Sequence, residues 1–252
     1  PNWASDSELF PDDLERLMPW LGRALERLPV LEEAGIRRIV YGAIPHSADG
    51  PPLLGPVAGL KNFWLCCGSS FGIAQGAGCG KYLAQWMLYG DSELNMTGFD
   101  PRRFGVFADE AYMRAKGFQD YQMTYFTPLP GEELPAARDI RTSPLHQRLK
   151  QQGAVHTQTF GWERPKWFAP EGEEENYSYR HNNTFDVVRE ECRAVRERVG
   201  LLDLSGFAKY EVSGPDAGGC LDRICANRMP RKTGGIVLAH VLSNAGRIRA
   251  EM

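Results

Sequence analysis

The chain has 252 residues, of which 42% are hydrophobic and 24% are charged, and its formal net charge is −3. This composition is ordinary for a soluble globular protein, and a slightly acidic chain lacks the basic surface by which proteins hold nucleic acid. Its apolar runs fall short of the ~18 residues that a membrane span needs. The sequence therefore predicts neither nucleic acid nor a membrane span.

The cysteines form no Cys-x-x-Cys pair and no cluster with histidine, which argues against structural zinc and iron–sulfur sites, so we expect no metal. We expect the cysteines to be small buried hydrophobic residues in a reducing compartment. They are Cys66, Cys67, Cys79, Cys192, Cys220 and Cys225.

The first predicted element is an amphipathic helix over residues 10–28, in which leucines recur at helical spacing. Pro19 is expected to kink or interrupt it. Residues 36–44 are apolar and β-branched, which predicts a strand. The stretch 45–59 is rich in turn residues and predicts a loop, with room for a short strand at Leu53-Leu54.

Residues 61–90 combine a short apolar run, a glycine-rich turn and a helical pattern. The run 63–67 predicts a buried strand, and residues 73–88 predict a helix. Gly72, Gly76 and Gly80 would then form one bare stripe on that helix. The spacing matches neither the Gly-x-Gly-x-x-Gly motif nor a Walker loop. The local pattern favours tight packing of the helix on its sheet, with contact between a cofactor and the helix start as the alternative.

The middle of the chain has a weaker pattern. A short helix is predicted over residues 109–116, and residues 127–181 are rich in proline, glycine and aromatic residues. This composition predicts an irregular segment between domains. Its aromatic residues Trp162, Trp167 and Phe168 could line a channel, but we expect core packing.

The last part begins with a predicted helix over residues 184–199, with Thr184 as its N-cap. Strands are predicted at 201–204 and 209–213, followed by a helix after Pro215. A hairpin is predicted around residues 244–246. The chain has no initiator methionine and its final strand looks cut short, so we expect an internal piece of a longer polypeptide, with an ordinary processed terminus as the alternative.

Three segments, taken in order, resemble the dimethylglycine/sarcosine dehydrogenase family of flavoproteins. The first is IPHSADGPPLLGPVAGLKNFWLCCGSSFGIAQGAGCGKYLAQWMLYG, the second is DIRTSPLHQRL with GWERPKWFAP, and the third is VGLLDLSGFAKYEVSGPDA with LSNAGRIRAEM. The resemblance implies a mixed α+β, multidomain fragment. Residues 1–95 would end an FAD-dependent oxidoreductase domain, 96–180 would form a linking domain, and 181–252 would begin a folate-binding domain similar to glycine-cleavage T-protein.

The resemblance also implies a reaction. The flavin, FAD, takes a hydride equivalent from an N-methyl group of a small methylated amino acid, and tetrahydrofolate captures the one-carbon unit. An electron-transfer flavoprotein or oxygen would reoxidise the flavin. The amino-terminal nucleotide-binding motif of the family is not among these residues, so we expect the activity to belong to the full-length protein and the piece alone to be inactive.

The resemblance assigns site residues one by one. The family's glycine-rich turn contacts the flavin, and the matching residues are Gly68, Ser70, Phe71, Gly72 and Ile73. In the folate-binding half, the matching acidic residue is Glu251, where relatives often carry aspartate. A solvent-facing strand carboxylate is the alternative for Glu251.

The loop before the last flavin-domain strand supplies two catalytic candidates, His46 and Asp49. His46 would transfer a proton or bind substrate, with an ordinary loop histidine as the alternative. Asp49 matches the aspartate of the family's Thr-Pro-Asp-Gly loop, although Ala48 replaces its proline. A turn-forming side chain bonded to nearby backbone is the alternative for Asp49.

Two other functions stay open. One is a non-catalytic relative similar to the regulatory subunit of pyruvate dehydrogenase phosphatase. The other is a folate-binding protein without flavin, against which residues 36–90 argue. The resemblance places the protein in the mitochondrial matrix if its source is eukaryotic, and in the cytoplasm if it is bacterial.

Overall fold

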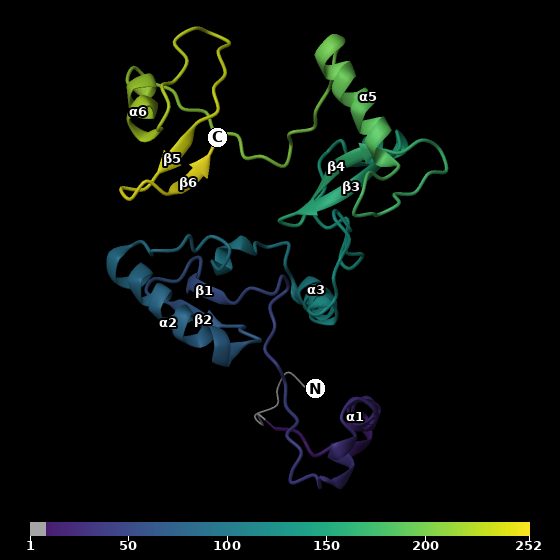
Figure 1. Ribbon diagram of the computed structural model, residues 1–252. Coiled ribbons are helices and arrows are strands. Elements are labelled where there is room, and N and C mark those ends of the chain that lie inside the picture. The colour runs from purple at the N-terminus through teal and green to yellow at the C-terminus, as the bar shows by residue number, and fades with distance from the viewer. Residues whose placement is uncertain (1–8) are drawn as a thin grey trace.

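A computed structural model describes residues 9–252, as a series of short helices and strand pairs strung along the chain (Figure 1). The helices are α1 (Leu14–Arg27), α2 (Gly72–Tyr89), α3 (Glu110–Met123), α4 (His146–Gln151), α5 (Thr184–Glu197) and α6 (Ala217–Ile224), with 3-10 helices η1 (Pro29–Glu33) and η2 (Pro101–Arg103). The strands are β1 (Leu53–Pro56), β2 (Trp64–Cys67), β3 (Ala154–Thr159), β4 (Trp162–Phe168), β5 (His240–Leu242) and β6 (Ile248–Glu251). This mixture of helices and strands agrees with the expected α+β class.

Every sheet in the described residues is an antiparallel pair of strands that follow one another in the chain: β1 with β2, β3 with β4, and β5 with β6. Within residues 9–252, no helix is both long enough and apolar enough to cross a bilayer.

The first core lies between the β1–β2 pair and α2, and its buried centre is Leu54, Leu83 and Met96. The indole rings of Trp64 and Trp86 pack edge to face beside it, 5.6 Å apart. Gly55 makes this approach possible, because a Cβ at this residue would lie 2.8 Å from the ring of Trp86. This core fixes α2 against the strand that leads into it.

The middle part is built on the β3–β4 hairpin. Its two-residue turn has positive φ at both Phe160 (50°) and Gly161 (77°), the combination that matches the right-handed twist of the two strands. Trp167 is 1% exposed, which confirms the expected core packing for this residue. Glu163, whose side chain is 0% exposed, accepts hydrogen bonds from Arg138 Nε and Nη2 at 2.8 and 2.6 Å. That ion pair ties the preceding loop to the hairpin.

The last hairpin contacts the first part of the chain. Arg249 in β6 forms an ion pair with Asp91, just after α2, at 2.7 Å, and Arg247 donates a hydrogen bond to the carbonyl of Ser92. These contacts join segments that lie about 150 residues apart in the sequence.

Several expected elements differ from the structure. Residues 36–44 and 201–213 are not strands; within residues 9–252, the first stretch makes an isolated bridge between Leu9 and Gly42. A strand is stable only beside a partner, and no described segment lies alongside either stretch as a ladder. The segment 127–181, expected to be irregular, instead contains β3, β4 and α4.

The helix ends and the cysteines also differ from expectation. Pro19 lies inside an uninterrupted α1, and Asn183, not Thr184, is the N-cap of α5. The expectation of buried cysteines is wrong for Cys66, Cys67 and Cys192, which are exposed, while Cys225 is buried. Cys66 and Cys67 lie at the exposed end of β2.

Candidate functional site

The glycine-rich turn joins the end of β2 to the start of α2. Gly68 has a φ of 74°, which allows the chain to reverse sharply after the strand. The N-cap of α2 is Phe71, and no side chain caps this end. The first N–H groups of the helix therefore remain available to an outside acceptor, and the helix dipole adds partial positive charge there.

The bare stripe on α2 faces open space. A Cβ placed at Gly72, Gly76 or Gly80 would meet nothing within 4 Å. Ile73 is fully exposed beside it. Among the described residues, nothing packs on the stripe, so it is an open surface for a flat group. This face and the uncapped helix start fit the ring end of a flavin.

His46 connects this turn to α3. Its Nε2 lies 2.6 Å from Oδ2 of Asp120, and its Nδ1 lies 3.0 Å from Oγ of Ser70. A carboxylate can only accept, so we assign the neutral ring's proton to Nε2, with the Ser70 hydroxyl donating to Nδ1. The His46 side chain is 10% exposed. The sequence candidates Ser70 and His46 are thus in direct contact.

Asp49 is held by an arginine. Arg103 donates from Nε and Nη2 to the two carboxylate oxygens of Asp49, both at 2.7 Å. The same guanidinium donates to the carbonyls of Pro51 and Asp100. The Ser47 hydroxyl also donates to Asp49, at 3.2 Å. Asp49 is therefore an anchor of its loop as well as a wall of the cavity described next.

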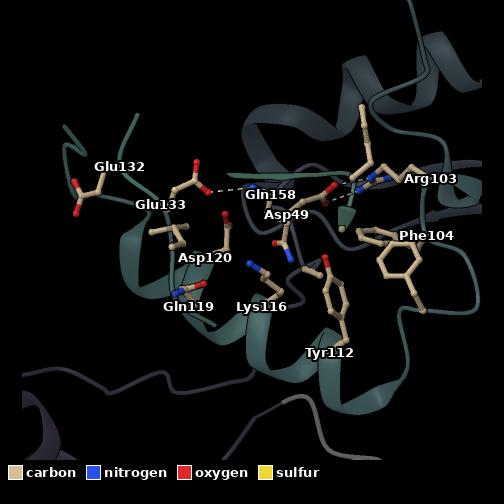
Figure 2. Close-up of a pocket in the computed structure, with 15 residues that line it drawn as sticks. Asp49, Arg103, Phe104, Tyr112, Lys116, Gln119, Asp120, Glu132, Glu133 and Gln158 are labelled. Atoms are coloured by element: carbon tan, nitrogen blue, oxygen red, sulfur yellow. Dashed lines mark hydrogen bonds and ion pairs between the residues drawn. The ribbon is translucent and has the colours of Figure 1, made fainter. Parts of the chain in front are cut away.

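A cavity of about 470 Å³ lies where this loop, α3 and the β3–β4 hairpin meet (Figure 2). One face of α3 supplies its floor through Tyr112, Lys116, Gln119 and Asp120, spaced three and four residues apart. Asp120 both lines the cavity and accepts from His46. The imidazole ring of His46 therefore lies between the cavity and the glycine-rich turn.

Two titratable groups in the cavity are perturbed. Burial, assisted by the negative charge of Asp49, raises the pKa of the Tyr112 hydroxyl. Burial, assisted by the positive charge of Arg138, lowers the pKa of the Lys116 ammonium. Both shifts follow from a site that is partly closed to water.

Glu251 lies apart from this site, in β6. It pairs with His240 in the β5–β6 ladder, and their side chains approach to 3.6 Å between Nε2 and Oε2. The Glu251 carboxylate is exposed and does not line the cavity beside α3. The structure therefore brings together His46, Asp49 and the glycine-rich turn, and leaves Glu251 on a separate surface.

The sequence candidates did not include Arg103, Tyr112, Lys116 or Asp120, which all line the cavity. The expected helix stopped at residue 116, whereas α3 continues to Met123. The spacing of Tyr112, Lys116 and Asp120 at intervals of four was a usable signal, because it places three polar side chains on one helical face.

Comparisons with known proteins divide the chain into three regions. Residues 2–86 match the family model of the FAD dependent oxidoreductase, residues 89–143 match the FAD dependent oxidoreductase central domain, and residues 145–252 match the GCVT N-terminal domain. Together these matches run along nearly the whole chain, in the order that the three segments of the sequence follow.

Curated relatives match the same stretch. The chain is 37% identical to dimethylglycine dehydrogenase, mitochondrial, of Rattus norvegicus over 97% of its length. It is 32% identical to sarcosine dehydrogenase, mitochondrial, of Homo sapiens over 97%, and 30% identical to pyruvate dehydrogenase phosphatase regulatory subunit, mitochondrial, of Mus musculus over 93%. The chain spans only 29%, 30% and 28% of the lengths of these three relatives.

The contact between His46 and Asp120 can be tested by substitution. Asp120→Ala leaves the mostly buried Nε2–H group without its acceptor, which should lower the free energy of unfolding by about 1–3 kcal/mol. Asp120→Asn keeps an acceptor oxygen and should cost less. Urea unfolding of the two variants measures the difference, and equal losses would contradict the hydrogen bond.

Proposed function

The chain belongs to the dimethylglycine and sarcosine dehydrogenase family, and we propose that the full-length protein is an FAD-dependent amine oxidoreductase. Its substrate is a small N-methylated amino acid. The enzyme removes an N-methyl group oxidatively, and tetrahydrofolate receives the one-carbon unit. One observation carries this proposal. The uncapped start and open glycine stripe of α2 are connected to a polar cavity through His46, which contacts Ser70 of the turn and Asp120 of the cavity.

We propose that Gly68, Ser70, Phe71, Gly72 and Ile73 hold the ring end of FAD. The open stripe of α2 offers a flat surface, and the helix start favours negative charge on the group that lies against it. FAD, when bound, supplies the acceptor for two electrons from the N-methyl group. The protein's own task is to orient the substrate beside it and exclude water.

His46 is the proposed proton-transfer residue. An amine can give up a hydride equivalent only as the free base, so the bound ammonium must first lose a proton. One ring nitrogen of His46 contacts Asp120 and the other contacts Ser70, and Asp120 also lines the cavity. The pair can therefore take a proton from the cavity side. Asp49 supports the site by holding its loop to Arg103.

The folate step is proposed for the part of the protein that contains Glu251. Its carboxylate lies 3.6 Å from His240 and is exposed, so a ligand bound by the rest of that domain could reach it. We propose an electron-transfer flavoprotein or oxygen as the electron acceptor. The protein would act in the mitochondrial matrix of a eukaryote, as the names of its relatives suggest, or in the cytoplasm of a bacterium.

The first test is the visible spectrum of the purified full-length protein. A flavin absorption band that is bleached anaerobically by sarcosine, dimethylglycine or a longer N-methylated amino acid would support the proposal and identify the substrate. A protein without flavin would overturn it, and would favour a non-catalytic role such as the name of the relative from Mus musculus describes.

Gly72→Val should lower the flavin content of the full-length protein several-fold. A Cβ at residue 72 would meet no described atom within 4 Å, so the substitution should not disturb local packing. A loss of flavin would then report on the contact with the cofactor. Gly22→Val in α1 is the matched control, since Gly22 is also helical and open. Flavin content is read from the absorbance ratio after gel filtration, and equal content in wild type and Gly72→Val would refute the assignment.

Glu251→Gln should impair capture of the one-carbon unit by tetrahydrofolate while the amine still reduces the flavin. The substitution removes the charge and keeps the size of the side chain. Glu251→Asp, which keeps the charge, should retain capture. The readouts are anaerobic flavin bleaching and the ratio of methylenetetrahydrofolate to free formaldehyde. If both steps fail together, the variant has misfolded and the role is not supported.

A further inference from the structure

Lys116 projects from α3 into the cavity without a partner. Figure 2 shows that its side chain extends from α3 and lies near Asp120, Gln158 and Tyr112. It forms no hydrogen bond or ion pair with any residue from 9 to 252, although it is partly buried. Glu133 and Glu163 act on the Lys116 ammonium only through their charge, and no carboxylate is hydrogen-bonded to it, so the site is better satisfied when a negative group binds there directly.

The other charged groups of the cavity are already engaged. The Arg103 guanidinium donates hydrogen bonds to Asp49 and to two backbone carbonyls. Asp120 accepts from His46, and Glu133 accepts from the backbone N–H of Gln158 at 3.2 Å. Lys116 is therefore the cation of this cavity that is left for a ligand, within the part of the chain that the structure describes.

The charged groups that line the cavity also indicate which kind of ligand it would bind. Lys116 presents a positive group, while the carboxylates of Asp120 and Glu133 line the same cavity. A small molecule with one negative and one positive end would meet both signs at once. The volume of about 470 Å³ has room for a small amino acid and its water.

We propose that Lys116 binds the carboxylate of the amino-acid substrate and thereby sets the preference for carboxylated over uncharged N-methyl amines. This inference rests on the proposed function and adds to it the residue that recognises the acid end. The amine then lies toward Asp120 and His46, on the side of the glycine-rich turn. Lys116 is a binding residue in this scheme, and no bond to it forms or breaks.

Substrate kinetics of the full-length protein test the proposal. In Lys116→Met, the concentration of dimethylglycine that half-saturates anaerobic flavin reduction should rise about 10- to 100-fold, the usual worth of a hydrogen bond to a charged group. The limiting rate should change little. The value for N,N-dimethylethanolamine, which lacks the carboxylate, should stay unchanged. Lys116→Arg should retain most of the affinity for dimethylglycine.

Arg114→Met is the matched control, because Arg114 is an exposed cation on α3 and does not line the cavity. It should leave both substrates unaffected. If Lys116→Met weakens both substrates equally, or neither, the proposal for Lys116 is overturned while the flavin chemistry stands. If no N-methyl amine reduces wild-type flavin, the proposed function fails, and the assignment of Lys116 fails with it.

Binding without turnover gives a second readout. Trimethylglycine has a carboxylate but no free base to oxidise, and choline lacks the carboxylate. Calorimetry should show tighter binding of trimethylglycine than of choline to the wild type, and loss of that difference in Lys116→Met. At mildly alkaline pH, binding of trimethylglycine should also take up protons, since pairing raises a lysine pKa that burial has lowered. An unchanged preference in the variant would contradict the proposal.

Discussion

The site depends on the ion pair between Arg103 and Asp49. Both hydrogen bonds of this pair measure 2.7 Å, and only 5% of the Arg103 side chain is exposed. Burying a guanidinium costs solvation free energy, which the bidentate pair and two backbone carbonyls offset here. The pair fixes the loop 46–51 against η2, and that loop in turn carries His46 toward the turn and the cavity. Gly50 completes the fit, because a Cβ there would lie 2.9 Å from the Asp120 carboxylate.

The elements that could be predicted from sequence are those whose pattern is complete within a few residues. The helices α2 and α5 carry their own periodicity, and the β5–β6 hairpin surrounds a strong turn signal. The stretches 36–44 and 201–213 carry strand-like residues, yet a strand needs a neighbour, and local sequence does not say whether one is supplied. The β3–β4 hairpin was hidden for a different reason. Pro165 lies inside its second strand, where a proline argues against a strand in the sequence, and its turn places Phe160, a poor turn former, at positive φ.

Some residues of the site could likewise be predicted from local sequence, and others could not. Residues of the glycine-rich turn and of the loop 46–51 could be named because each group is contiguous and resembles a family segment. Their partners come from far along the chain: Arg103 lies 54 residues from Asp49, and Asp120 lies 74 residues from His46. No sequence pattern links such pairs, so only the fold shows that they meet. The role of Lys116 is visible only after its neighbours are known to be paired.

The pairing of each sheet from successive strands also bears on how the protein is made. The chain segments that close the three hairpins are short, residues 57–63, 160–161 and 243–247, so the entropy lost in closing them is small. Contacts that are local in sequence form quickly. Each hairpin can therefore form as soon as its second strand has left the ribosome, and the long-range contacts of Arg103 and Arg249 can join parts that already have structure.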